Sequence, residues 1–181
     1  MKPKTPACGL HAALAVLTAL TGLSAFSALY APATHAADAP ALGFALNITL
    51  SPKAASLLQR TKEGITVSAR YYGDPTVAAR KHANEVGQID LGGEELRLSA
   101  RGGPAQITGQ GVKRYRLHWT QGAPKVNVNA FSSRRSHADN LLSCDFIDGE
   151  VDAVLQAQPL ELHCSLITEG RASVLRPQGA R

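Results

Sequence analysis

Ser136, His137 and Asp139 fall within four positions of the segment FSSRRSHADNL, directly after Arg134 and Arg135. A serine nucleophile requires an imidazole that reaches the serine oxygen with one nitrogen and an aspartate with the other. Paired arginines favour a different chemistry, the binding of a carboxylate or a phosphate. The segment therefore offers three interpretations: a hydrolase site, an anion site or an ordinary polar loop.

The hydrolase interpretation has the weakest support. Ser136 and His137 are sequence neighbours, and neighbouring side chains diverge in extended structure. No G-x-S-x-G motif precedes them. A hairpin tip also supplies neither a fixed surrounding shell nor protection from water. The polar loop is the simplest alternative, with Asp139 or Asn140 making the turn.

Anion binding remains a hypothesis that depends on a second segment. In KRYRLHW, alternation predicts a strand with Arg114, Arg116 and His118 on one face. If that face lies beside Arg134 and Arg135, the combined charge would favour carboxylates, phosphates or sulfated glycans. The alternative is an ordinary polar sheet face whose charge discourages edge pairing. The hypothesis requires six arginines to converge around one concavity: Arg70, Arg80, Arg114, Arg116, Arg134 and Arg135.

Residues 1–36 have the layout of a secretory leader. Lys2 and Lys4 precede an apolar stretch over residues 9–30, which small residues follow as far as Ala36. This order predicts cleavage after Ala36. The alternative is an uncleaved anchor, because the stretch approaches the roughly 20 residues that span a bilayer. With cleavage, we expect a periplasmic or secreted protein without a membrane span.

The chain that remains after cleavage is long enough for one domain. Removing residues 1–36 from the 181-residue sequence leaves 145 residues. The leader carries two of the 19 basic residues and none of the 14 acidic ones, so the net charge falls from +5 to +3. Such a modest excess gives no argument for nucleic acid as a partner.

Cys144 and Cys164 remain after the expected cleavage. Alternation in LLSCDFI and LELHCSLI places both on the apolar faces of strands, with their sulfurs inward. An even number of cysteines in an oxidising compartment predicts one structural disulfide. Thioredoxin-like chemistry is a poor alternative because there is no C-x-x-C motif.

The rest of the chain has a hydrophobic period of two. Alternation is clearest in ALGFALNITL and recurs near 65–72, 88–91, 95–98, 105–108, 113–120, 125–131, 141–147 and 160–167. Ser51 and Pro52 predict the start of a short helix that runs to about Arg60. About seven or eight strands with one or two short helices predict an all-β, antiparallel β-sandwich with one disulfide. We expect it over residues 37–168, with a flexible C-terminal tail over 169–181.

The run LNITLSPKAASLLQRTKEGITVSARYYGDPTVAARKH resembles segments of uncharacterised secreted bacterial β-sandwich proteins. Its order of strand, Ser-Pro helix, strand ending in Ala-Arg, Gly-x-Pro and Val-Ala-x-Arg is also similar to the periplasmic C-terminal β domain of a cytochrome c biogenesis factor. This chain lacks that domain's proline before the Ala-Val pair, and it adds a cysteine pair. The resemblance implies a noncatalytic periplasmic interaction module. The residues that carry it are Leu50, Pro52, Val67, Ala69, Arg70, Gly73, Pro75, Val77 and Arg80.

Metal and cofactor chemistry has little support in the sequence. His82, His118, His137 and His163 form no H-x-H, H-E-x-x-H or spaced Cys/His set. The acidic run DFIDGEVD could hold calcium through oxygen ligands, but it does not match an EF-hand loop. We therefore predict neither a metal nor a cofactor.

The connection GDPTVAARKHANEVG, residues 73–87, is the loop best suited to binding, because sandwiches commonly bind through such loops. We expect either a short helix that begins at Thr76 and ends at Gly87 or an ordered functional loop. The sequence as a whole predicts a secreted or periplasmic noncatalytic module for an unknown protein or a small anionic ligand. The alternatives are a structural envelope-associated protein without a discrete ligand and, with less support, a hydrolase or metal-dependent enzyme.

Overall fold

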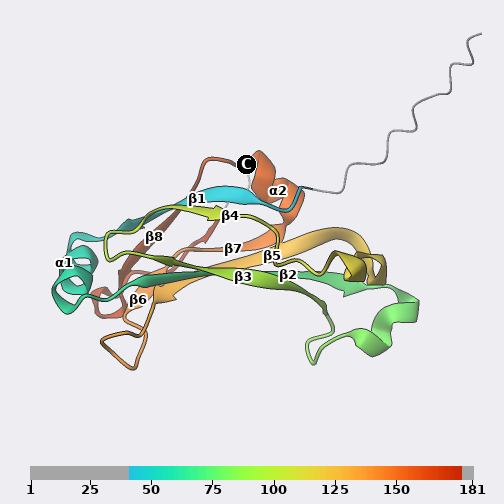
Figure 1. Cartoon of the computed structure of the whole chain (residues 1–181), viewed down its shortest axis with the longest axis horizontal. Coiled ribbons are helices and arrows are strands. Elements are labelled where there is room, and N and C mark those ends of the chain that lie inside the picture. The colour runs from blue at the N-terminus through green and yellow to red at the C-terminus, as the bar shows by residue number, and fades with distance from the viewer. Residues whose placement is uncertain (1–40, 177–181) are drawn as a thin grey trace, which may run out of the picture. The chain divides into compact units, whose positions relative to one another are not determined.

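Two packed β-sheets form the domain in the computed structural model, which describes residues 41–176 (Figure 1). One sheet has the order β4-β1-β8-β6, with β4 Gly103–Ile107, β1 Phe44–Leu50, β8 Leu160–Leu166 and β6 Leu142–Cys144. The other has the order β3-β2-β5-β7-β9, with β3 Ile89–Leu98, β2 Ile65–Pro75, β5 Thr120–Ser132, β7 Phe146–Glu150 and β9 Leu175–Arg176. The all-β sandwich is confirmed. The predicted leader, residues 1–36, lies outside the described residues.

The two sheets are mixed, so the prediction of a purely antiparallel sandwich is wrong. β1 pairs antiparallel with β4 but parallel with β8, and β7 pairs parallel with β9. A period of two reports which face a side chain occupies, whereas it carries no information on the direction of the neighbouring strand. The alternation that located β1 and β8 therefore could not reveal how they pair.

The predicted helix after the first strand is confirmed as α1, Pro52–Thr61. The Ser51 hydroxyl accepts a hydrogen bond from the Ala54 amide at 3.1 Å, and proline occupies the first turn, where its missing N–H costs nothing. Ala54 and Leu58 are fully buried against the sandwich. Lys62 ends the helix in the left-handed conformation, with φ of 56°.

The core lies between the two sheets and contains the alternating residues that the sequence analysis placed inward. Tyr71 is buried among them, and its hydroxyl donates to the Leu42 carbonyl oxygen. The largest fully buried aliphatic side chains come from both sheets, from α1 and from the segment before β1: Leu42, Ile48, Leu58, Ile65, Ile89, Leu91, Ile107, Ile147 and Leu162.

The strand predicted over 113–120 is wrong for most of its length. Residues Arg114–Trp119 form a 3₁₀ helix, η2, and β5 begins only at Thr120. The Thr120 hydroxyl donates to the Leu117 carbonyl at 2.8 Å, and the Lys113 amide donates to the Leu91 carbonyl of β3. These contacts replace a sheet ladder, so the expected face of Arg114, Arg116 and His118 does not exist.

Three other elements differ from the sequence expectation. The strands expected at 88–91 and 95–98 form one strand, β3, whose pairing with β2 shifts register at Tyr71/Tyr72. The helix expected from Thr76 exists as the 3₁₀ helix η1, Val77–His82, and stops well before Gly87. A short helix, α2 (Val151–Gln156), follows β7 and was not expected. Within the described residues, no helix has the length and apolarity needed to cross a membrane.

The segment after β8 is attached to the sandwich as far as residue 176, which the expected tail from 169 did not anticipate. After the 3₁₀ turn η3, Ile167–Glu169, it returns along β7 as β9. The fully buried carboxylate of Asp145 accepts hydrogen bonds from Arg171, at 2.8 and 3.3 Å, from Arg176 at 3.4 Å and from the Val174 amide. Burial would raise the pKa of Asp145, but the Arg171 guanidinium and the Val174 amide lower it.

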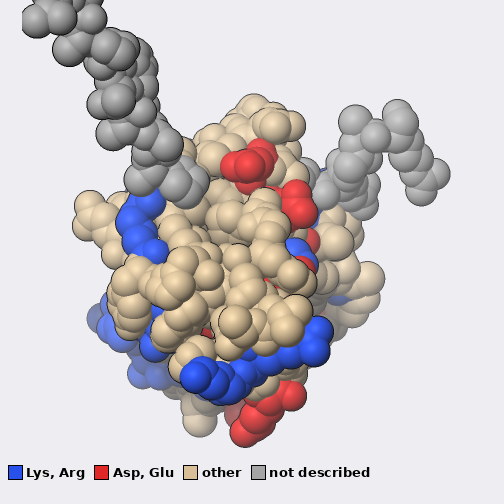
Figure 2. Space-filling model, turned by 90° about the vertical axis from the view of Figure 1, so that its right-hand side faces the viewer, with Lys and Arg blue, Asp and Glu red and all other residues tan. Residues whose placement is uncertain are grey.

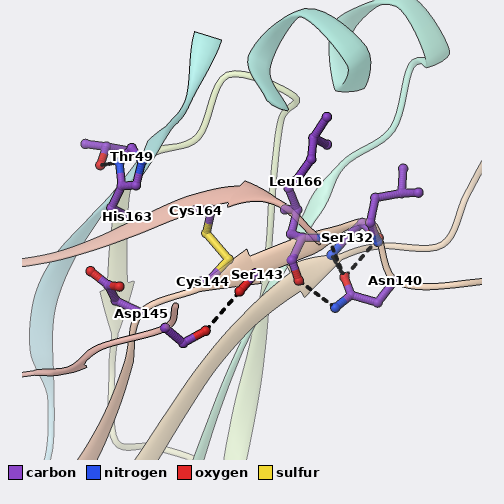
Figure 3. Close-up of a disulfide and its surroundings, with 12 residues drawn as sticks. Thr49, Ser132, Asn140, Ser143, Cys144, Asp145, His163, Cys164 and Leu166 are labelled. Atoms are coloured by element: carbon purple, nitrogen blue, oxygen red, sulfur yellow. Dashed lines mark hydrogen bonds between the residues drawn. A yellow bond between two sulfur atoms is a disulfide. The ribbon is translucent and has the colours of Figure 1, made fainter. Parts of the chain in front are cut away.

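The predicted disulfide is confirmed, and it joins neighbouring strands of one sheet (Figure 3). Cys144 of β6 and Cys164 of β8 face each other directly in the antiparallel register. Their Cα atoms are 4.0 Å apart, and both residues are buried. Asp145 follows Cys144 at the point where the chain leaves the four-stranded sheet and enters the five-stranded one.

Replacing both cysteines by alanine should lower the free energy of unfolding by about 3 kcal/mol, because the disulfide closes a loop with a sequence separation of 20. Urea denaturation of the wild-type and Cys144→Ala/Cys164→Ala proteins measures the difference. Mass spectrometry supplies the control, since the native chain should gain two protons on reduction. Two free thiols in the native protein would contradict the assignment.

Replacing Asp145 by asparagine should release the 171–176 segment, because the two arginines lose their shared carboxylate. We expect faster amide hydrogen exchange at Val174 and a loss of about 3 kcal/mol in the free energy of unfolding. Asp152→Asn is the matched control, because Asp152 is exposed on α2. Equal exchange rates in both variants would show that the carboxylate does not hold the segment.

Candidate functional site

The Ser-His-Asp segment turns out to be an anion-binding loop whose anion is the protein's own Glu63. Oε1 of Glu63 accepts hydrogen bonds from the Gly64 amide at 2.9 Å and the Arg135 amide at 3.0 Å. Oε2 accepts from the amide and the hydroxyl of Ser136, both at 2.8 Å. Arg134 adopts the left-handed conformation, with φ of 56°, and successive amides in such a turn form an anion-binding concavity.

The Glu63 carboxylate is held ionised by these donors. Only 2% of the residue is exposed. Burial alone would raise the pKa of Glu63, but the hydrogen bonds from the Ser136, Arg135 and Gly64 amides and the Ser136 hydroxyl lower it from 4.5 to about 2. A shift of this size stabilises the folded state by about 3 kcal/mol at neutral pH. The arrangement therefore fastens the loop to the junction of α1 and β2.

This geometry is unsuited to serine catalysis. The Ser136 hydroxyl lies 2.9 Å from Nδ1 of His137, but it also donates to Glu63. A carboxylate with a pKa of about 2 is a poor general base near neutral pH. Within residues 41–176, His137 has no hydrogen bond to an acid, and Asp139 takes no part in the cluster. The loop that suggested chemistry is a structural connection.

The six arginines of the anion-site hypothesis do not converge. Arg134 and Arg135 follow Ser132, which pairs with Ile65 at one end of β2. Arg80 and Arg114 lie on η1 and η2, beyond the opposite end of β2, where Pro75 pairs with Thr120.

β2 has 11 residues, so these two ends are roughly 30 Å apart. In Figure 1 the loop after β5 lies near α1, whereas the 3₁₀ helices lie at the other end of the sandwich. The hypothesis of one arginine-lined concavity is therefore wrong. Arg116 binds Asp90, at 2.9 Å to its carbonyl oxygen and 3.3 Å to Oδ2, and Arg70 lies on the outer face of β2.

The end that carries η1 and η2 presents a mixed aromatic and basic surface, which we call the η1–η2 surface (residues 77–88 and 113–119). Trp119 is its centre: the His82 ring stacks on the Trp119 ring at 4.3 Å between centroids, and His118 meets it edge-on at 5.5 Å. The Arg116 guanidinium lies 5.7 Å from the Trp119 ring centroid and 5.6 Å from that of Tyr115. The Thr76 amide donates to the Trp119 carbonyl and joins the two helices.

This surface exposes apolar side chains beside positive charge. Of the five large hydrophobic residues exposed within 41–176, three belong to it: Val77 and Val86, each 74% exposed, and Tyr115, 64% exposed. Figure 2 looks onto this end and shows Lys and Arg side chains along its lower and left-hand margins, around a centre that carries little charge. The basic residues that it contains are Arg80, Lys81, Lys113, Arg114 and Arg116.

A polar pocket of about 310 Å³ lies beside this surface, on the outer face of the five-stranded sheet. The strand register brings Asn127 opposite Arg70 on one side and opposite Asp148 on the other. The loop after η1 closes the pocket with two amide side chains. Its lining includes Arg70, Tyr72, Asn84, Gln88, Asn127 and Asp148.

Burial and hydrogen bonds shift the pKa values of two groups in this pocket, Tyr72 and Asp90. The Tyr72 hydroxyl donates to Oδ1 of Asp148 at 2.6 Å. Burial, this hydrogen bond and the charges of Asp148 and Asp74 raise the pKa of Tyr72 to about 12, so the hydroxyl stays protonated. Asp90 is partly buried, which would raise its pKa, but the Gly92 amide and the Lys113 ammonium lower it.

No group of three His, Cys, Asp or Glu side chains within the described part of the chain is placed to hold a metal ion. The fold separates the side chains of the acidic run that suggested calcium. Asp145 is buried and pairs with Arg171 and Arg176, whereas Asp148 lies on the outer face of the sheet and accepts a hydrogen bond from the Tyr72 hydroxyl.

Comparison with protein-family models, with curated proteins and with solved structures finds no significant match to this chain. The resemblance of residues 46–82 to secreted bacterial β-sandwich proteins therefore stays a prediction. The functional argument rests on the geometry of the η1–η2 surface and the pocket.

Two features of the site had no usable signal in the sequence. Glu63 follows a helix, where a carboxylate is ordinarily solvated, and its partners are about 70 residues away in the chain. The pocket arises because β2, β5 and β7 align three polar side chains in one row, which depends on the register. The loop 73–87, which the sequence analysis named as the loop best suited to binding, contributes Asn84 to the pocket, and its binding role stays a prediction.

Replacing Glu63 by glutamine should lower the free energy of unfolding at pH 7 by about 3 kcal/mol, because a neutral amide cannot accept from four donors. The wild-type contribution is present above about pH 4.5 and is lost as the pH falls toward 2, since the folded-state pKa is the lower one. Urea denaturation at pH 7 and pH 3 measures both effects. Glu95→Gln, on the exposed face of β3, is the control; equal losses in the two variants would contradict the role of Glu63.

Proposed function

We propose that the protein is a secreted or periplasmic noncatalytic binding module, and that its partner is a protein with an acidic surface that docks on the η1–η2 surface. The observation that carries the proposal is the exposure of Val77, Val86 and Tyr115 among basic side chains at one end of the sandwich. Exposed apolar side chains bordered by polar and charged residues are one mark of a protein interaction site.

The composition of this surface supports a protein interface. Interfaces combine an apolar, aromatic centre with a polar margin, and Tyr, Trp and Arg are enriched among the residues that contribute most of the binding energy. Tyr115, Arg116 and Trp119 supply these three residue types within one 3₁₀ helix. The margin carries the exposed basic residues Arg80 and Lys81, whereas Lys113 and Arg116 share the carboxylate of Asp90 and Glu85 is the acidic residue of the 77–88 loop. Charge complementarity therefore favours an acidic partner.

The extracytoplasmic location is supported by two observations. The first 36 residues have the composition of a leader, and the chain contains a structural disulfide. The location remains part of the proposal.

Site-specific photo-crosslinking tests the proposal. A photoreactive phenylalanine analogue placed at Tyr115, with the full chain produced in its native host, should capture one specific acidic protein after illumination. The same analogue at Phe131, on the outer face of β5 near the opposite end, should not. Absence of an adduct from position 115, or the same adducts from both positions, would contradict the proposal.

Charge reversal separates electrostatic docking from nonspecific capture. The double variant Arg80→Glu/Lys81→Glu should lower the yield of the Tyr115 adduct by about ten-fold, because these exposed charges lie beside the apolar centre. Arg134→Glu changes the charge at the far end of the sandwich and should leave the yield unchanged. A yield that is equal in all variants would show that positive charge plays no part.

A further inference from the structure

The pocket beside the η1–η2 surface differs from it in chemistry, because its lining is polar. Arg70 projects from the outer face of β2, and its aliphatic part lies close over Gly93, which has no side chain to obstruct it. Within residues 41–176, the Arg70 guanidinium has no hydrogen bond or ion pair. An arginine held without a partner beside a concavity is available to a ligand.

Two carboxylates line the pocket with Arg70, and each already accepts at least one hydrogen bond. Oδ1 of Asp90 accepts from the Gly92 amide at 3.0 Å, and its Oδ2 accepts from Lys113 at 3.1 Å and Arg116 at 3.3 Å. Oδ1 of Asp148 accepts from Tyr72. Asp148 is also separated from Arg70 by the intervening strand β5, because Asn127 pairs with Arg70 on one side and with Asp148 on the other.

The side-chain amides leave their donors available. Oδ1 of Asn84 accepts from the Val86 amide at 3.1 Å and the Gln88 amide at 2.9 Å, which fixes the orientation of the group. Oδ1 of Asn127 accepts from Asn129. The amino groups of Asn84 and Asn127 thus have no partner within the described residues, and they line the same pocket as Arg70.

We propose that this pocket binds a hydroxylated monocarboxylate, the chemical class of sugar acids such as uronates. The Arg70 guanidinium binds the ligand carboxylate as a bidentate pair, with the amino groups of Asn84 and Asn127 donating to its oxygens. The second oxygen of Asp148 accepts from a ligand hydroxyl. The charges of Asp90 and Asp148 disfavour a dianion such as phosphate. The volume of about 310 Å³ lies at the lower end of the range for small-molecule sites and suits a monosaccharide.

The pocket shares Asn84 and Gln88 with the η1–η2 surface, but this inference can be tested separately from the acidic partner protein, because it depends on Arg70 and the outer face of the sheet. Loss of the photo-crosslink at Tyr115 would leave it standing. Failure of the pocket to bind a sugar acid would likewise leave the proposed partner untouched.

Titration by NMR tests the proposal on the mature chain. D-glucuronate, D-galacturonate and D-gluconate, each to about 20 mM, are compared with D-glucose, acetate and inorganic phosphate. At least one sugar acid should shift the amide resonances of Gln88 and Asn127 and bind about ten-fold more tightly than all three controls. Glucose lacks the carboxylate, acetate lacks the hydroxyls, and phosphate carries excess charge.

The variant Arg70→Gln should weaken binding of the sugar acid by about ten-fold or more, because hydrogen bonds to a charged group are lost. Arg97→Gln is the matched control, since Arg97 is exposed on the outer face of β3 near the other end of the sheet. Circular dichroism verifies that both variants are folded. The proposal is overturned if no sugar acid binds, if glucose or phosphate binds as tightly, or if the two variants bind equally.

Discussion

The buried carboxylate of Glu63 is the interaction on which the arrangement of the connections depends. It follows directly after α1, at the start of β2, and it accepts hydrogen bonds from the loop that leaves β5. The Ser133 amide donates to the Gly64 carbonyl next to it, so the two chain segments are joined at successive residues. A buried ion is costly unless it is fully hydrogen-bonded, and this one receives four donors. A single side chain thereby determines the path of a loop that would otherwise be a solvated hairpin.

Asp145 is a second buried carboxylate that is compensated by hydrogen bonds, and it lies where the chain passes from the four-stranded to the five-stranded sheet. Its carboxylate is fully buried and receives two arginines and a backbone amide from the segment that becomes β9. The carboxylates of Glu63 and Asp145 therefore both serve to hold connecting segments against the sandwich. The η1–η2 end contrasts with them, because its apolar side chains are exposed and the nearby pocket contains donors without partners. This contrast, between buried acids that are fully hydrogen-bonded and exposed apolar side chains beside a pocket with available donors, is the basis of the functional proposals.

The sequence predicted those parts of the fold that follow from local pattern. Alternation located β1, β2 and β5, the Ser-Pro pair placed α1, and the cysteines were correctly paired. Pairing direction could not be obtained in this way, because a side-chain period of two is common to parallel and antiparallel strands. The segment 113–119 alternates like a strand, but its contacts with β3 and the Thr120 hydroxyl fold it as η2. Tertiary contacts overrode the local pattern there, as they commonly do for β propensity.

The candidate site was less accessible to sequence reasoning than the fold. Residues 134–139 do bind an anion, as their types suggested, but the anion is the Glu63 carboxylate of the same chain. The sequence does not show which end of β2 each arginine lies near. The strand register decides this, and it places Arg134 and Arg135 at the opposite end from Arg80 and Arg114. The loop 73–87 stood out in the sequence by its length, its basic residues Arg80, Lys81 and His82, and the two tyrosines that precede it.

The most direct test of this account is the pKa of Glu63, measured by following its side-chain carboxyl ¹³C resonance in an NMR pH titration. The account predicts a titration midpoint of about 2, with slow exchange of the Arg135 and Ser136 amides while the carboxylate stays ionised. A midpoint near the ordinary value of 4.5, with rapid exchange of both amides, would show that the loop is not held by Glu63 and would contradict the account.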